Sequence, residues 1–162
     1  MRHDPESWNG AEWGGLVFFL KELPSRRMIE GYAGQFAVDP AAIEDGLGVM
    51  RQASLMIRRL DSYFNGHGLS QLRFLVLIVI DREEERDSLT IGEITDRLDV
   101  SGPVMARTLR MLLEDGLVTK TSGDADSRVR HIALTPRGKD GLTAVLPGYF
   151  QIISEEMERW SR

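Results

Sequence analysis

Two closely spaced helix starts in the second half of the sequence constrain its fold more than any other feature. Thr90 and Glu93 have the spacing of a capping box, in which each side chain bonds the backbone amide of the other residue at a helix N-terminus. Ser101 offers the next N-cap, and Pro103 suits the first turn behind it because proline has no amide to leave unpaired. Gly116 then ends the second helix in the left-handed conformation. The spacing of these two helices predicts a helix-turn-helix.

Two short strands follow the helices directly. Residues 117–121 and 129–134 carry strand patterns, and the turn-rich residues 122–128 separate them as a charged hairpin tip. Two helices and a hairpin in this order form a winged helix-turn-helix. Its second helix is narrow enough to enter the major groove of DNA, and its hairpin tip reaches the backbone or the neighbouring minor groove. We therefore expect a mainly α fold with a small β-hairpin, and double-stranded DNA as its partner.

Helical signals on both sides of this motif predict the remaining organisation. Residues 1–38 carry apolar positions at helical spacing, which indicates an ordered helical extension. A long helix occupies residues 39–66, with an aspartate and a proline as its start signals. The winged helix-turn-helix domain takes residues 67–135, and a last helix takes residues 136–162.

No apolar run in the sequence is long enough to cross a bilayer. The runs at residues 16–20 and 74–80 fall far short of the roughly 20 residues that a membrane helix needs, and no basic-then-apolar signal segment is present. We therefore expect a cytoplasmic protein without a membrane partner. Periodicity leaves the run 74–80 open between a helix and a buried strand, and its neighbours favour a helix.

The distribution of charge favours a nucleic-acid partner, although the net charge does not. The formal net charge of −5, taken alone, argues against nucleic acid. Residues 101–139, however, hold seven basic and four acidic residues, whereas the rest of the chain has an acidic surplus. The basic surplus therefore coincides with the segment that would touch phosphates.

The residue types needed for catalysis, metal binding or redox chemistry are missing or scattered. The chain has no cysteine, which excludes disulfides and thiolate metal sites. His3, His67 and His131 lie far apart and lack the pairing of a zinc site. No nucleophile is paired with a base, so we predict no enzymatic activity, no metal and no cofactor.

An ordered set of motifs matches a known protein family. The set covers roughly residues 43 to 150, and its members are Leu69-Ser70-Gln71, Leu89-Thr90-Ile91-Gly92-Glu93-Ile94, Val100-Ser101, Arg107, Leu112, Gly116-Leu117-Val118, Asp126-Ser127-Arg128 and Leu134-Thr135-Pro136-Arg137-Gly138. Each piece alone would be weak, but the ordered set is specific. On these residues the sequence resembles the MarR family of bacterial transcription regulators.

The resemblance implies a quaternary structure and a mode of regulation. Family members are dimers of winged helix domains joined through helices from both chain ends, so residues 1–38, 39–66 and 136–162 are expected to form a homodimer region. Members of the family bind pseudo-palindromic operators, commonly as repressors. They release the operator when a small, often aromatic, effector occupies a pocket between the dimer region and the DNA-binding lobe.

The resemblance also assigns DNA contacts. Arg107 matches the recognition-helix arginine, and Asp126 and Arg128 match the Asp-x-Arg of the wing. In that motif the arginine enters the minor groove, where it reads groove shape more than base identity, and the aspartate holds it in position. The full set of expected DNA contacts is Thr90, Ser101, Pro103, Val104, Ala106, Arg107, Arg110, Asp126, Arg128 and Arg130.

Three features depart from the family pattern. The wing usually has two consecutive arginines after its aspartate, and here the first is Ser127. The recognition helix is usually polar on its DNA face, whereas this one offers Pro103, Val104 and Ala106. Residues 137–162 suffice for little more than one of the two C-terminal helices that the family usually has. We expect the N-terminal extension to supply part of the dimer contact, through Trp13, Leu16, Phe18, Phe19, Leu20, Met28, Tyr32 and Phe36.

An effector pocket is expected where the long helix meets the next one. Tyr63, His67, Arg73 and Phe74 would surround a carboxylated aromatic molecule there with apolar walls and polar groups. The alternative, that these four are ordinary surface and core residues at a helix junction, stays open.

An alternative to DNA binding stays open at this point. A winged helix can serve as a protein-interaction module without sequence-specific DNA binding, and the overall acidity and the short C-terminal end would be natural in such a module. DNA affinity that falls steeply with salt would distinguish a regulator from a module.

Overall fold

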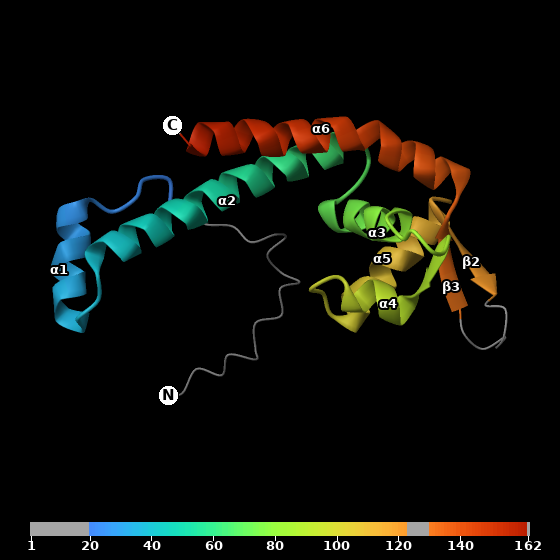
Figure 1. The fold of residues 1–162 in the computed structure, drawn as a ribbon, viewed down its shortest axis with the longest axis horizontal. Helices are drawn as coiled ribbons and strands as arrows, with labels where there is room; N and C mark the ends of the chain where they lie inside the picture. Colours follow the sequence, from blue (N-terminus) through green and yellow to red (C-terminus); the bar gives the residue numbers. More distant parts are fainter. Residues whose placement is uncertain (1–19, 123–129, 162) are drawn as a thin grey trace. The chain divides into compact units, whose positions relative to one another are not determined.

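The computed structural model describes residues 20–122 and 130–161. Its elements in chain order are α1 (Arg26–Phe36), α2 (Pro40–Gly66), α3 (Gln71–Asp81), β1 (Ser88–Thr90), α4 (Ile91–Asp96), α5 (Gly102–Glu114), β2 (Val118–Ser122), β3 (Arg130–Leu134) and α6 (Pro136–Trp160) (Figure 1). The chain divides into two compact units, one made of the residues up to Arg59 together with Ile152–Arg162, and the other of Leu60–Gln151. Helices α2 and α6 contribute to both units.

The unit of residues 60–151 is built around α3. Ser70 caps this helix, because its hydroxyl accepts a hydrogen bond from the Arg73 N–H (3.3 Å). The apolar run at residues 74–80 is therefore helical, and α3 packs against α5 and β3. The core of the unit includes side chains of α3, α5 and the sheet, namely Phe74, Val76, Leu77, Val79, Ile80, Leu89, Met105, Leu109, Leu112 and Ile132.

The sheet has a strand that the sequence pattern did not predict. β2 and β3 form the expected antiparallel hairpin, with Val118 opposite Leu134. β1 pairs with the other edge of β3 and places Leu89 opposite Ile132, and both side chains are 0% exposed. A strand of 3 residues is too short to show an alternating pattern, and its last residue already serves as the cap of α4. The expected hairpin is thus part of a three-stranded sheet.

Thr135 joins the sheet to the start of α6. Its hydroxyl donates to the Gly116 carbonyl (2.6 Å) and accepts from the Gly138 N–H (3.0 Å), while its own N–H donates to the Leu117 carbonyl (3.1 Å). These bonds hold the first turn of α6 against the start of β2. A Cβ atom at Gly138 would lie 1.9 Å from the Leu117 carbonyl oxygen, so this approach requires glycine.

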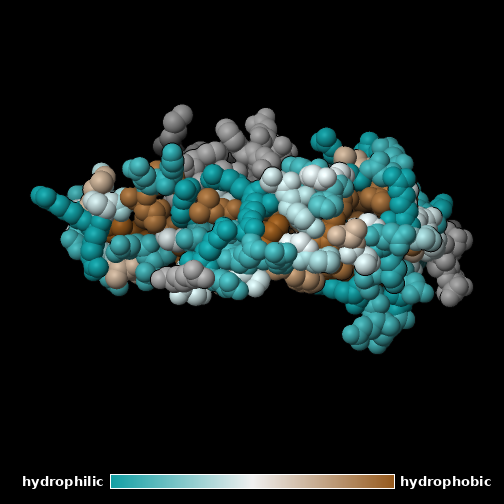
Figure 2. All heavy atoms as spheres, turned by 90° about the horizontal axis from the view of Figure 1, so that it is seen from above, coloured by the Kyte–Doolittle hydropathy of each residue, from teal (hydrophilic) through white to brown (hydrophobic). Residues whose placement is uncertain are grey.

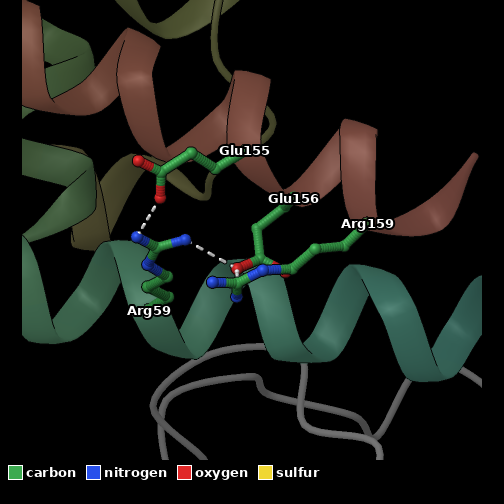
Figure 3. Close-up of polar contacts among 4 residues, drawn as sticks. All are labelled: Arg59, Glu155, Glu156 and Arg159. Carbon is green, nitrogen blue, oxygen red and sulfur yellow. Dashed lines mark hydrogen bonds and ion pairs between the residues drawn. The ribbon is translucent and has the colours of Figure 1, made fainter. Parts of the chain in front are cut away.

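The other unit contains α1, most of α2 and the end of α6. Ser25 caps α1 by accepting from the Met28 N–H (3.4 Å). Arg59 of α2 forms ion pairs with Glu155 and Glu156 of α6, and Arg159 also pairs with Glu156 (2.8 Å) (Figure 3). The Glu156 side chain is only 8% exposed, and two guanidinium groups therefore offset the cost of burying its carboxylate.

Candidate nucleic-acid interface

The first helix of the helix-turn-helix, α4, begins with the predicted capping box. The Thr90 hydroxyl accepts from the Glu93 N–H (3.2 Å), and the Glu93 carboxylate accepts from the Thr90 N–H (2.7 Å). Arg86 pairs with the same carboxylate at 2.8 Å. The Thr90 N–H first, and Arg86 second, lower the pKa of Glu93 to about 2. The carboxylate therefore stays charged and fixes the start of α4.

Replacing Glu93 with alanine should destabilise the protein in a pH-dependent way. Loss of the cap is expected to lower the free energy of unfolding by about 1 kcal/mol at neutral pH. The pKa of Glu93 falls from 4.5 to about 2 on folding, so its contribution is complete above pH 4.5 and disappears as the pH falls toward 2. Urea unfolding of the two proteins between pH 7 and pH 2 measures this difference. Glu84→Ala, at an exposed position in the same connection, is the control, and a difference that stays constant down to pH 2 would contradict the assignment.

The second helix, α5, has one buried and one exposed face. Met105, Thr108, Leu109 and Leu112 are buried against the rest of the unit. The exposed face carries Pro103, Ala106, Arg107, Arg110, Met111 and Glu114, while Val104 is half-buried at its margin. Four of the expected DNA contacts thus share one surface of α5, and Val104 lies beside them.

Ser101 occupies the N-cap position of α5 but does not cap it. Its backbone is extended, as at the other N-caps, yet its side chain makes no capping hydrogen bond. The expectation that Ser101 caps the helix through its side chain is therefore wrong. Pro103 stands at the second helical position and has no N–H, which removes one of the two amides that an N-cap side chain usually binds.

The described part of the wing adds cationic side chains. Lys120 of β2 and Arg130 of β3 are both exposed. Arg130 stands opposite Ser122 at the described end of the hairpin. Asp126 and Arg128, the expected wing contacts, lie outside the described residues. Lys120 did not figure among the expected contacts, because nothing in the local sequence distinguishes it from an ordinary strand residue.

Of the four expected effector-binding residues, two line one cavity. His67 and Arg73 border a hollow of about 620 Å³ together with Leu77, Leu117, Arg137 and Val145. Phe74 is 0% exposed and stacks on Phe64 at 4.6 Å between ring centroids, in the core of the unit. Tyr63 packs on the His67 ring at 4.5 Å and donates its hydroxyl hydrogen to the Val145 carbonyl (3.0 Å).

Arg73 ties α3 to the end of α5. Its side chain is 10% exposed and forms an ion pair with Asp115, the residue that follows α5. It also donates to the Gly68 carbonyl (3.2 Å), whereas its Nε has no hydrogen-bond partner among the described residues. A buried guanidinium with one unpaired donor next to a cavity is a group that an anionic ligand can use.

Neither a metal cluster nor a membrane-spanning helix is found among the described residues. Within residues 20–122 and 130–161 no three His, Asp or Glu side chains gather as a metal site would require. No helix in that same part of the chain is long and apolar enough to span a membrane.

Comparison with known proteins identifies the family. A MarR family model matches residues 67–129. The HTH-type transcriptional repressor YetL of Bacillus subtilis (strain 168) is 33% identical over 144 residues, which cover 88% of this chain and 85% of YetL. Sco3205, a MarR family transcriptional regulator from Streptomyces coelicolor solved in complex with DNA, has a TM-score of 0.67 at 18% identity over 74% of each chain. BpsR of Bordetella bronchiseptica, whose DNA binding is regulated by 6-hydroxynicotinic acid, has a TM-score of 0.59 at 16% identity over 70% of this chain and 83% of BpsR.

These similarities confirm the predicted winged helix-turn-helix fold. They also confirm the resemblance to the MarR family on which the further expectations rested. The likeness to solved structures establishes the fold, and the identity with YetL across most of both chains establishes the family. The chain belongs to the MarR family of DNA-binding transcriptional regulators.

Proposed function

We propose that this chain is a homodimeric repressor that binds a pseudo-palindromic operator and is released by a small aromatic acid. The observation that carries the proposal is the exposed face of α5, where Arg107 and Arg110 stand one turn apart, with the exposed Lys120 and Arg130 on the wing strands of the same unit. A helix that enters the major groove needs such a face, and phosphates need the cations beside it. The proposal adds the wing residues Asp126 and Arg128, and it places the protein in the cytoplasm with the chromosome.

Exposed apolar side chains support the homodimer. Met28, Tyr32 and Phe36 follow one another at four-residue spacing on α1 and are 54%, 65% and 69% exposed. Met157 and Trp160 near the end of α6 are also exposed, and Figure 2 shows hydrophobic atoms at the surface between hydrophilic ones. Apolar surface of this kind marks sites of protein association. Residues 1–38, 39–66 and 136–162 are the segments that we assign to the dimer. The expected contacts Trp13, Leu16, Phe18 and Phe19 lie outside the described residues.

The cavity at His67 and Arg73 supports an anionic effector. Its lining combines the apolar side chains of Leu77, Leu117 and Val145 with Arg73 and Arg137 as cationic partners for a carboxylate, and it also includes Asp115 and Asp140. BpsR, a structural relative, is regulated by an aromatic acid. A carboxylate that pairs with Arg73 would compete with Asp115, and the end of α5 would lose its bond to α3. Binding in the cavity would thereby change the position of the DNA-reading helix.

A DNA titration at several salt concentrations tests the proposal. The protein is titrated with a labelled duplex from upstream of its own gene, and we expect affinity to fall by a factor of about 10³ or more between about 50 and 200 mM salt. Arg107→Ala should weaken binding about tenfold, as loss of a base or phosphate contact does. Arg82→Ala, at an exposed position after α3 and outside both the expected DNA contacts and the segments assigned to the dimer, is the matched control. An affinity for the duplex that changes neither with the salt concentration nor on replacement of Arg107 would instead favour the protein-interaction module.

A further inference from the structure

The first two turns of α5 have an unusual surface for a helix that reads DNA. From the helix start up to Ala106 its exposed residues are Gly102, Pro103 and Ala106, and the half-buried Val104 borders them. None of these side chains can donate or accept a hydrogen bond. The first long polar side chain of the exposed face is that of Arg107, which lies one turn beyond Pro103.

The position of this apolar surface matters because the N-terminal residues of a recognition helix lie closest to the base edges. In the major groove each base pair presents hydrogen-bonding groups, and the one apolar group among them is the C5 methyl of thymine. A Cβ atom at Gly102 would meet no atom within 4 Å, so the helix start is open to close approach. An apolar helix start in the groove therefore leaves amino, carbonyl and ring-nitrogen groups of other bases without partners, and it favours thymine.

We propose that Pro103 and Ala106 select thymine methyl groups in the operator, and that Arg107 and Arg110 supply the polar contacts beside them. This inference rests on the proposed function, because it names the sequence feature that the DNA-reading face recognises. The step of four positions from Pro103 to Arg107 advances the helix by about 6 Å, which is roughly two base-pair steps. Each operator half-site should therefore hold its required thymines within two or three base pairs of the pair that Arg107 contacts.

Replacement of thymine by deoxyuridine tests this selection, because it removes the methyl group and leaves base pairing unchanged. A tight duplex is first selected by the full-length protein from a random-sequence pool, and each thymine is then replaced singly by deoxyuridine. At one or two positions in each half-site we expect affinity to fall about fourfold, which equals about 0.8 kcal/mol, the value of one buried methyl or methylene group. Deoxyuridine outside the half-sites should have no effect.

Two further measurements distinguish a direct methyl contact from a change in DNA shape. In Ala106→Gly the loss on deoxyuridine substitution should vanish at one position per half-site and persist at the others. At a sensitive position, a C·G pair should bind weakly, and 5-methylcytosine there should recover part of the loss. The proposal is overturned if the selected duplex binds tightly and salt-dependently but tolerates deoxyuridine everywhere, an outcome that leaves the proposed function standing. If no duplex is enriched at all, the proposed function fails and this inference fails with it.

Discussion

Gly138→Ala should destabilise the protein by about 3 kcal/mol, a loss at the upper end of what overpacking usually costs. The new methyl carbon would lie 1.9 Å from the Leu117 carbonyl oxygen and 2.9 Å from the carbonyl carbon. Both are backbone atoms, which cannot rotate away as the end of a side chain can. Relief requires the first turn of α6 to move, and that movement breaks the bonds that Thr135 makes to Gly116 and Leu117.

Gly141→Ala is the matched control, because it lies one turn further along the same helix. A Cβ atom there would meet no atom within 4 Å. Alanine has a higher helix propensity than glycine, so this variant should be stabilised by up to about 1 kcal/mol. Thermal and urea unfolding followed by circular dichroism measures both. Equal stabilities of the two variants would show that the close approach at Gly138 does not govern folding.

The order of helices and hairpin could be predicted because its signals are local. Thr90 and Glu93 bond each other's backbone as their spacing predicts, and Ser70 caps α3 in the same way. β1 could not be predicted, since its pairing partner β3 lies more than 40 residues further along the chain. A strand this short exists only because that partner is present.

Of the candidate nucleic-acid interface, too, only the part with local signals could be predicted from the sequence. The helical period places Arg107 and Arg110 on one face, and the structure agrees because Met105, Leu109 and Leu112 take the other. The ion pair of Arg73 with Asp115 joins residues 42 positions apart, so no local pattern could show it. The N-cap position of Ser101 was visible in the sequence, but its unused side chain was not, because that depends on hydroxyl geometry as well as on Pro103.

Substitution of Phe74 distinguishes a ligand contact from a core residue, because the first would change ligand binding and the second the free energy of unfolding. Its ring is 0% exposed and lies 4.6 Å from Phe64 and 4.7 Å from Tyr149 between centroids. Phe74→Ala should lower the free energy of unfolding by about 3–5 kcal/mol, because it removes a large buried side chain and leaves a cavity among aromatic rings. Urea unfolding of the variant beside the unchanged protein measures this loss.

Phe74→Leu is the matched variant, since it keeps most of the apolar volume. This variant should lower the free energy of unfolding by roughly 1–2 kcal/mol. The difference between the two variants then measures how much of the loss in Phe74→Ala comes from the apolar volume that leucine retains. An aromatic acid that binds at His67 and Arg73 should retain its affinity for Phe74→Leu, because the Phe74 side chain is fully buried and does not line that cavity. If Phe74→Ala instead abolished binding of such an acid while unfolding stayed unchanged, Phe74 would be a ligand contact and not a residue of the core.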